Sequence, residues 1–302
     1  MQIVYYHNVV GDPIDAYDRR LSRITRDEFA RQIDAVTRRL RPVSLPEMLE
    51  RREPGTIAFT FDDGFRGVLA HAFPVLAERG IPASVFVVTT RLEDADDAIF
   101  HFDEIEIAFR LTRRRLLRLP LLGPIPHPMA TPFGRVWTLK RLKRRLKVKS
   151  EDERLVWHAR VLAALDVPAE TCRAHARSLE KYRTLTRAEL QQLIDAGWTV
   201  GAHTRTHRTL SCLPQDELHD EVDGSRRDLE RLLGLRDMPF AYPYGEPAHI
   251  SADAEREVAN AGFTCGLTTI PGANTADVGR FTLRRYTFEQ LMDDVSKQRS
   301  KT

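Results

Sequence analysis

Short apolar stretches alternate with helical periodicities along most of this chain. The apolar stretches predict strands at residues 2–6, 56–61, 83–88, 198–202, 239–242 and 263–268, with a further extended segment at 281–287. Amphipathic spacing between them predicts helices, among them one near 67–79 and one near 216–233. Strands that alternate with helices favour a parallel sheet of an α/β protein, and about seven such units predict closure into a barrel.

Capping signals support this reading of the helices. Thr25 with Glu28 and Thr186 with Glu189 have the spacing of a capping box, in which the first side chain and the acid satisfy each other's backbone amides. Ser44 is placed to cap a short helix in the same way. The N-terminal ends of three helices are therefore predicted from single residues.

The segment from about 91 to 182 interrupts the alternation. Residues 110–149 contain thirteen Lys or Arg and no Asp or Glu, so the rest of the chain carries a net charge of −10 although the whole carries +3. We therefore expect a single domain over 1–302 with a helical, basic insertion at about 91–182. The apolar residues interleaved with this charge are Leu116, Leu117, Leu119, Leu121, Leu122, Val136, Trp137, Leu139 and Leu142.

Two interpretations of the insertion remain open at this point. It is either a helical subdomain with its own small core, or a surface that contacts an anionic membrane or an acidic glycan. No nucleic-acid-binding motif is recognised, so we do not expect a nucleic acid partner.

Composition and targeting signals set further limits. A chain of 302 residues with 42% hydrophobic and 29% charged residues is neither disordered nor fibrous. We find no signal peptide and no apolar run long enough to span a bilayer. The three cysteines are far apart and lack CxxC spacing. The expected location is cytoplasmic, with peripheral contact at the inner membrane face.

Two stretches carry candidate chemistry. Asp62 and Asp63 follow a buried strand directly, where one carboxylate binds a cation and the other takes up a proton, unless they form a simple surface turn. His203 and His207 follow another strand and are four residues apart, which lets both imidazoles meet one ion. Asp63, His203 and His207 would give three ligands and an open position that activates water. The same ligand types also form the facial triad of non-haem iron oxygenases, but the helical alternation argues against that class.

These stretches resemble the motifs of the NodB-type polysaccharide deacetylases, carbohydrate esterase family 4. Thr60-Phe-Asp-Asp-Gly64 looks like the first motif, His203-Thr-Arg-Thr-His207 like the second and Phe240-Ala-Tyr-Pro-Tyr-Gly245 like the third. The resemblance covers residues 1–90 and 183–290 and implies a deformed (β/α)7 TIM-like barrel with a divalent metal. It also implies roles for individual residues: Asp62 as general base, Asp63, His203 and His207 as metal ligands, and the Tyr244 backbone amide as oxyanion donor.

The chain departs from the family pattern in three places, and one of them is that no tryptophan-containing fourth motif is evident near residues 268–275. Ala241 stands where the third motif usually has an arginine that supports the base, and Leu283-Arg-Arg285 replaces the Leu-x-His that usually supplies the general acid. Arg284 or Arg285 could replace the missing support.

The opening Tyr5-Tyr-His-Asn8 resembles the branch that acts on poly-N-acetylglucosamine or on capsular polysaccharide, where a first-strand histidine takes over the acid role. His7 is therefore the expected acid. His101, in the insertion, is the other candidate, because His158 and three other histidines are expected in helices remote from the strand ends.

The predicted function is that of a metal-dependent hydrolase of non-peptide carbon–nitrogen bonds. Its substrate would be an N-acetylated carbohydrate in polysaccharide biosynthesis or modification, and its metal Zn²⁺, with Co²⁺, Ni²⁺ and Fe²⁺ as the other candidates. Two alternatives are a deacylase of a lipid-linked or nucleotide-linked sugar precursor and a catalytically inactive glycan-binding relative.

Overall fold

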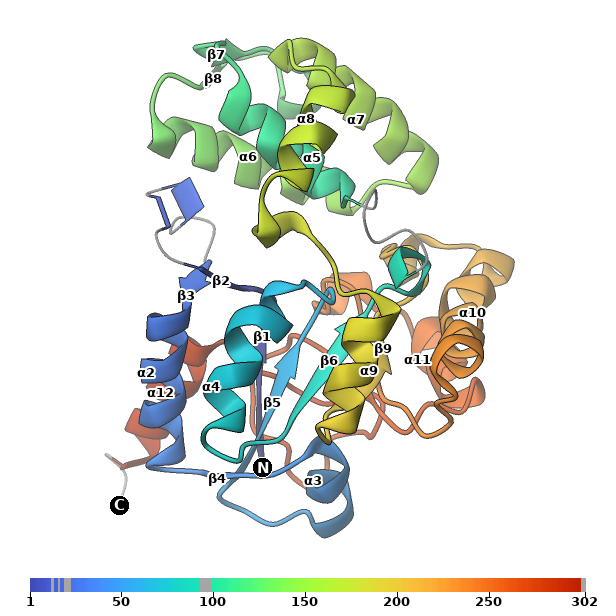
Figure 1. The fold of residues 1–302 in the computed structure, drawn as a ribbon. Helices are drawn as coiled ribbons and strands as arrows, with labels where there is room; N and C mark the ends of the chain where they lie inside the picture. The colour runs from blue at the N-terminus through green and yellow to red at the C-terminus, as the bar shows by residue number, and fades with distance from the viewer. Residues whose placement is uncertain (12–13, 16, 19–22, 93–98, 300–302) are drawn as a thin grey trace.

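The protein consists of a barrel with a layer of helices over one end, as the computed structural model in Figure 1 shows. The structure describes residues 1–11, 14–15, 17–18, 23–92 and 99–299. The barrel is built from the residues before and after the helical layer, so the chain leaves it once and returns to it once.

Seven parallel strands form the main sheet, in the order β1-β5-β6-β9-β10-β11, with β4 paired to the start of β5. Their bounds are β1 (Gln2–Tyr6), β4 (Arg41–Pro42), β5 (Thr56–Phe61), β6 (Ala83–Val87), β9 (Thr199–Ala202), β10 (Phe240–Ala241) and β11 (Gly266–Leu267). Because all these strands run in one direction, their carboxyl ends meet on the side that faces the helical layer.

A short extended segment joins the two edges of this sheet. The Thr268 amide donates to the Leu283 carbonyl at 2.8 Å on the β11 side, and the Tyr5 amide donates to the Tyr286 carbonyl at 3.0 Å on the β1 side. Residues 283–286 therefore bridge β11 and β1 in parallel. The predicted fold class, an α/β protein with a deformed barrel of parallel strands, is confirmed.

Helices surround the barrel, and the predicted caps are present. The helices around the barrel are α2 (Arg26–Thr37), α3 (Leu45–Arg51), α4 (Phe73–Ala77), α9 (Arg187–Asp195), α10 (Gln215–Leu233), α11 (Ala252–Asn260) and α12 (Phe288–Arg299). Thr25 and Thr186 form complete capping boxes, and the Ser44 side chain accepts from the Glu47 amide. A small parallel pair, β2 (Val9–Val10) with β3 (Ile24–Thr25), precedes α2.

Some predicted elements are shorter than the sequence pattern indicated. β10 has two residues instead of four, because Pro239 and Pro243 flank it and proline has no amide to donate to a ladder. β11 also has two residues. The helix expected near 67–79 is a π-helical turn at Val68–Ala72 followed by α4, and Pro74 removes a helical hydrogen bond at the junction.

The layer over the barrel has its own hydrophobic core. It contains α5 (His101–Leu111), α6 (Pro132–Lys147), α7 (Glu151–Leu165), α8 (Ala169–Arg177) and the hairpin of β7 (Leu116–Leu117) with β8 (His127–Pro128). Six of the nine interleaved apolar residues are buried in this core: Leu117, Leu119, Leu122, Val136, Leu139 and Leu142. The interpretation of those six as a membrane-facing surface is therefore wrong. Within the described part of the chain, no helix is long and apolar enough to cross a bilayer.

Candidate active site

The two adjacent aspartates lie at the carboxyl end of β5. The Asp62 amide continues the ladder by donating to the Tyr6 carbonyl at 2.9 Å, and the Asp62 side chain is buried, with 1% of its surface exposed. The chain then turns through Asp63 and Gly64, which both have positive φ. A Cβ on Gly64 would lie 2.9 Å from a methyl group of Val87, so this turn requires glycine. The turn directs the two carboxylates to different partners.

Asp62 is held by a buried arginine from the other end of the chain. Arg285 Nη1 donates to Asp62 Oδ1 at 2.8 Å and Nη2 donates to Oδ2 at 2.7 Å, in a fork-to-fork pair. The guanidinium also donates to the Thr268 carbonyl at 2.7 Å and to the Thr60 hydroxyl at 3.3 Å. Of the two arginines proposed as support, Arg285 makes this contact, whereas Arg284 is exposed.

The positive charge of Arg285 determines the ionisation state of the Asp62 carboxyl. Burial alone would raise the pKa of this carboxyl, but Arg285 and, more weakly, His203 and His7 outweigh burial and hold the pKa below its usual value. Asp62 is therefore ionised at neutral pH.

Asp63 is brought together with the two histidines of the second motif. Asp63 Oδ1 lies 3.2 Å from His207 Nε2 and 3.5 Å from His203 Nε2, and the three ligand atoms are within 4.8 Å of one another. Within the described residues, Asp63 Oδ1 is buried and accepts no hydrogen bond. An orphaned carboxylate oxygen beside two imidazole nitrogens fits a divalent cation, because a cation would satisfy all three atoms at once.

The histidines are oriented for such a role. His203 Nδ1 lies 2.7 Å from the Ala241 carbonyl, which leaves Nε2 directed at Asp63. Burial lowers the pKa of His203 to about 4, so the imidazole is neutral at neutral pH, as a metal ligand must be. Burial raises the pKa of Asp63, but the nearby histidines, including His7, outweigh burial, and the net shift is downward.

Backbone strain is concentrated at this site. Six non-glycine residues in the described part of the chain have positive φ, and four of them are Asp63, Thr204, His207 and Tyr244, with φ between 62° and 71°. The other two are helix C-caps, where this conformation is usual. Positive φ at non-glycine positions costs free energy, and such residues cluster at functional sites.

Tyr244 connects the barrel site to the helical layer. Its ring packs edge-on against His207, with centroids 4.9 Å apart, and against Phe102 of α5 at 6.1 Å. Lys147 Nζ of α6 lies 4.6 Å from the centre of the same ring. Sequence reasoning missed Phe102 and Lys147, because their approach to Tyr244 depends on how the helical layer packs on the barrel.

The histidines considered as proton donors are placed as follows. His7 directly follows β1 and is exposed. Its ring packs edge-on against Tyr5, with ring centroids 5.7 Å apart. It lies near enough to both aspartates to contribute to the lowering of their pKa values. The rings of His101 and His158 are tilted against each other by 34° with centroids 5.0 Å apart, and both residues line a cavity of about 220 Å³ beside His207. The expectation that His158 is remote from the site is therefore wrong, because α7 folds back over the barrel mouth.

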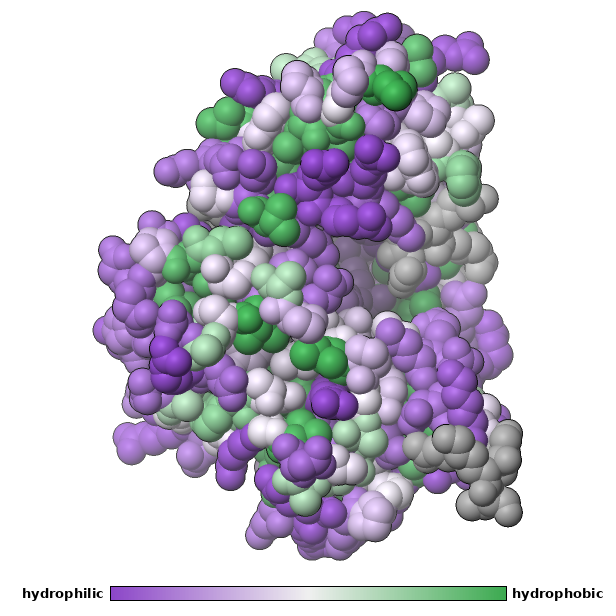
Figure 2. All heavy atoms as spheres, turned by 180° about the vertical axis from the view of Figure 1, so that it is seen from behind, coloured by the Kyte–Doolittle hydropathy of each residue, from purple (hydrophilic) through white to green (hydrophobic). Residues whose placement is uncertain are grey.

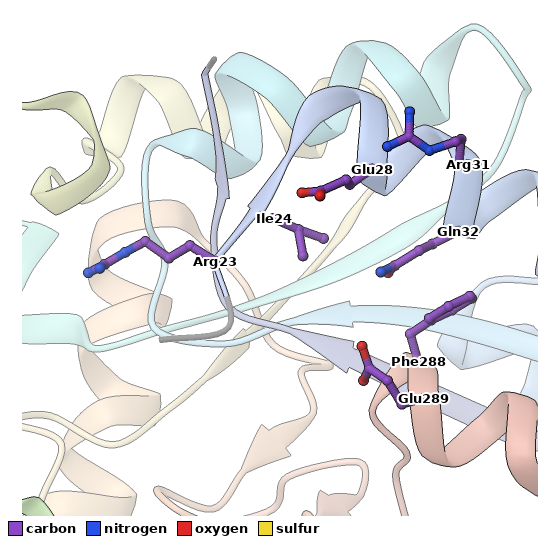
Figure 3. Close-up of a pocket in the computed structure, with 7 residues that line it drawn as sticks. All are labelled: Arg23, Ile24, Glu28, Arg31, Gln32, Phe288 and Glu289. Atoms are coloured by element: carbon purple, nitrogen blue, oxygen red, sulfur yellow. The ribbon is translucent and has the colours of Figure 1, made fainter. Parts of the chain in front are cut away.

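A second hollow, of about 500 Å³, lies away from these residues (Figure 3). Gln32 of α2 and Phe288 of α12 face each other across it, with Glu28 and Glu289 nearby. Glu28 already accepts from the Thr25 amide in a capping box. This hollow contains none of the candidate catalytic or ligand residues.

Comparison with known proteins identifies the family. The model of the polysaccharide deacetylase family matches residues 50–107 and 157–266, which is more than half of the chain. The chain belongs to the polysaccharide deacetylase family. This is a family of hydrolases that act on carbon–nitrogen bonds other than peptide bonds, and the predicted resemblance to NodB-type enzymes is confirmed. The match is interrupted at 108–156, within the helical layer.

Individual relatives are distant. YxkH of Bacillus subtilis is 23% identical over 109 residues, and the aligned part covers 36% of this chain and only 38% of YxkH. Streptococcus pyogenes deacetylase PplD, solved in complex with acetate, has a TM-score of 0.59 at 15% identity and covers 97% of this chain and 96% of its own. IcaB from Ammonifex degensii has a TM-score of 0.58 at 19% identity, with 97% and 96% covered, and shares the fold.

The pair of Asp62 with Arg285 yields the first prediction. Arg285→Gln leaves a buried carboxylate without its counter-charge, which should lower the free energy of unfolding by about 3–5 kcal/mol. Chemical denaturation monitored by circular dichroism measures this change. Arg284→Gln is the matched control, since it removes the same charge from an exposed neighbour and should change stability by no more than about 0.5 kcal/mol. Equal effects of the two variants would contradict the assigned role of Arg285.

Proposed function

We propose that this protein is a metal-dependent deacetylase that removes N-acetyl groups from a carbohydrate in polysaccharide biosynthesis or modification. The observation that carries the proposal is the orphaned Asp63 oxygen between two histidine nitrogens, beside an ionised Asp62, in a chain of the polysaccharide deacetylase family.

Asp63, His203 and His207 would hold the metal. Two imidazoles and one carboxylate suit Zn²⁺, and Co²⁺, Ni²⁺ and Fe²⁺ accept the same donors. When bound, such an ion supplies Lewis-acid chemistry, which lowers the pKa of water and polarises an acyl carbonyl.

The chain's own residues would then perform the proton transfers. Asp62 accepts the proton of the attacking water; each of its oxygens has one lone pair directed at Arg285 and keeps a second one available. The Tyr244 backbone amide donates to the developing oxyanion, a contribution of roughly 3 kcal/mol in comparable sites. His7, exposed at the mouth beside both aspartates, donates a proton to the departing amine.

The contact between Arg285 and Asp62 bears on the alternative of an inactive glycan-binding relative. That alternative drew its support from two departures, the missing arginine of the third motif and the missing histidine of the last motif. The contact bears on the first of them. In the structure Arg285 supplies the same kind of support from another segment, so the base is held and charged. We therefore favour an active enzyme.

We also propose that residues 1–302 form one deacetylase domain and that the helical layer, within about 91–182, is an insertion. The interruption of the family match at 108–156 supports this division. So does the separate hydrophobic core of the layer.

The outer side of this insertion supports a peripheral contact with an anionic membrane. All the large hydrophobic side chains that are exposed in the described residues lie between 111 and 156. On α6, Phe133 and Trp137 are 63% and 43% exposed and share a face with Arg141, whose guanidinium lies over the Trp137 ring, and with Arg144. Aromatic side chains with basic neighbours on one helix face suit the interface of an anionic bilayer. This contact also favours a lipid-linked sugar as the second candidate substrate.

The metal site yields the second prediction. His203→Ala and His207→Ala should each lose bound metal and acetate release, because each removes one of three ligands. Asp62→Asn should keep the metal and lose turnover, because it removes a base and not a ligand. Elemental analysis and an acetate assay on acetylated oligosaccharides measure the two properties. Stoichiometric metal in a His203→Ala, His207→Ala double variant would refute the ligand assignment.

The role of His7 yields the third prediction. His7→Ala should retain the metal and lower amide hydrolysis by roughly two to four orders of magnitude, because an amine departs poorly without a proton. An aryl acetate ester has a leaving group that needs no protonation, so its hydrolysis should be largely spared. The ratio of the two rates is the measurement. Equal losses on amide and ester would exclude His7 as the acid, and His101 would be the next residue to test.

The membrane contact yields the fourth prediction. The protein should cosediment with vesicles of anionic lipid at low ionic strength and dissociate as salt is added. Phe133→Ala with Trp137→Ala should weaken this binding. Arg144→Glu should weaken it as well, whereas Arg38→Glu, which reverses an exposed charge after α2, should not. Failure of the parent protein to cosediment would rule out the contact.

A further inference from the structure

The cavity of about 220 Å³ beside His207 has an unusual combination of walls. It is lined by residues of both the barrel and the helical layer. Figure 2 shows, on the opposite face from Figure 1, a recess between these two parts of the molecule with hydrophilic side chains around it. Phe100, Phe102 and Tyr244 give it aromatic walls. Flat apolar rings beside polar groups suit a sugar ring, which stacks its own apolar face on them.

Arg91 is fixed at one side of this cavity. The turn η2 (Thr89–Leu92) carries it, and the amides of Thr89 and Thr90 each donate at 3.1 Å to carbonyls of the loop that bears His207. The Arg91 guanidinium lies 3.8 Å from the centre of the Phe100 ring, and that ring packs edge-on against His207 at 5.4 Å. Burial lowers the pKa of Arg91 to about 10, so the side chain is still a cation at neutral pH.

A second cation, Lys147, directly follows Leu146, which lines the cavity, and approaches the lining residue Tyr244. Its Nζ lies 4.6 Å from the centre of the Tyr244 ring, which in turn packs against His207 at 4.9 Å. The Lys147 carbonyl accepts from the Thr209 hydroxyl at 2.8 Å, which ties the end of α6 to the barrel. Burial lowers the pKa of this amine. Two cations are thus each separated from the candidate ligand His207 by one aromatic ring.

Among the described residues, neither Arg91 nor Lys147 has an anionic partner. The acidic run at 93–97 lies outside the described residues. Other cations around the layer are paired: Arg23 and Lys143 contact Glu106, and His158 and Arg173 contact Glu104.

The carboxyl that acts most on Arg91 is Asp103, and the one that acts most on Lys147 is Glu246; neither forms an ion pair with that cation. Burial and the charge of Glu106 raise the pKa of Asp103 to about 7, so it offers only part of a negative charge at neutral pH. Partly desolvated cations without partners cost free energy, and a ligand anion would recover it.

We propose that the acetylated sugar carries a carboxylate or phosphate group and that Arg91 and Lys147 bind this anion in the cavity beside His207. This inference rests on the proposed deacetylase function and specifies the class of its substrate. The guanidinium of Arg91 presents a fork that matches either anion, and the amine of Lys147 adds a second charge. The rings of Phe100 and Tyr244 would hold the sugar between them, with its acetamido group toward Asp63 and His203.

The test compares three small ligands on the metal-loaded protein by isothermal titration calorimetry. N-Acetylglucosamine 1-phosphate and N-acetylglucosaminuronic acid are the anionic ligands, and methyl N-acetylglucosaminide is the neutral one. At least one anionic ligand should bind about tenfold or more tightly than the neutral ligand, and the stronger of the two shows whether phosphate or carboxylate is preferred. No binding of either anionic ligand up to about 10 mM would overturn the inference.

Variants separate this site from the metal, which could also bind an anion. Arg91→Gln and Lys147→Gln should each lower the affinity for the anionic ligand about tenfold. The affinity for the neutral ligand should not change. Arg145→Gln, which removes an exposed charge of α6, should keep the preference. Because neither cation has a described anionic partner, both test variants should also be at least as stable as the parent without ligand. A preference that persists in both variants would place the anion on the metal and overturn the inference.

The outcomes for the two proposals are distinguishable. Acetate release from neutral sugars with no preference for anions would leave the deacetylase function standing and refute the anion site. A preference that depends on Arg91 and Lys147, without acetate release from any sugar, would support the anion site and refute the deacetylase function.

Discussion

The pairing of Arg285 with Asp62 is the interaction on which the rest of the barrel mouth depends. Two charges that are almost fully excluded from solvent are tolerated only when their hydrogen bonds are satisfied, and here the carboxylate fork, the Thr268 carbonyl and the Thr60 hydroxyl accept from the guanidinium. Arg285 lies in the segment that bridges β11 to β1. The same side chain therefore helps to close the barrel and sets the charge and orientation of the proposed base.

This arrangement separates two carboxylates that are adjacent in sequence. Asp62 is bound at both oxygens by Arg285, and the positive φ of Asp63 turns the next side chain toward His203 and His207. Without that division, two neighbouring anions in a buried site would compete for one cation, and one of them would take up a proton. The strain at Asp63 and His207 is the structural cost of holding three ligand atoms around one point.

The local parts of this site could be predicted from sequence, and the long-range parts, with one exception, could not. Strand β5, the capping boxes and the pairing of His203 with His207 follow from patterns within a few residues. The grouping of Asp63 with these histidines is the one long-range contact that was predicted, because the ends of parallel strands were expected to meet at one mouth. Arg285 was only one of two candidates, because it is 223 residues from Asp62 and nothing local shows which of two adjacent arginines faces inward. The apolar residues of the insertion were ambiguous for the same reason: periodicity shows that a face is apolar but not what covers it.

The helical layer supplies what a barrel mouth lacks. The ends of parallel strands can present ligands and a base, but they leave the substrate open to water on the far side. Phe100, Phe102 and Lys147 bring a second wall against Tyr244 and His207; the family match includes the two phenylalanines and leaves out Lys147. The barrel would thus carry the chemistry common to the family. The insertion would decide which sugar reaches it, through two cations near the barrel mouth that have no anionic partner in the described part of the chain and through a separate face with exposed aromatic and basic residues.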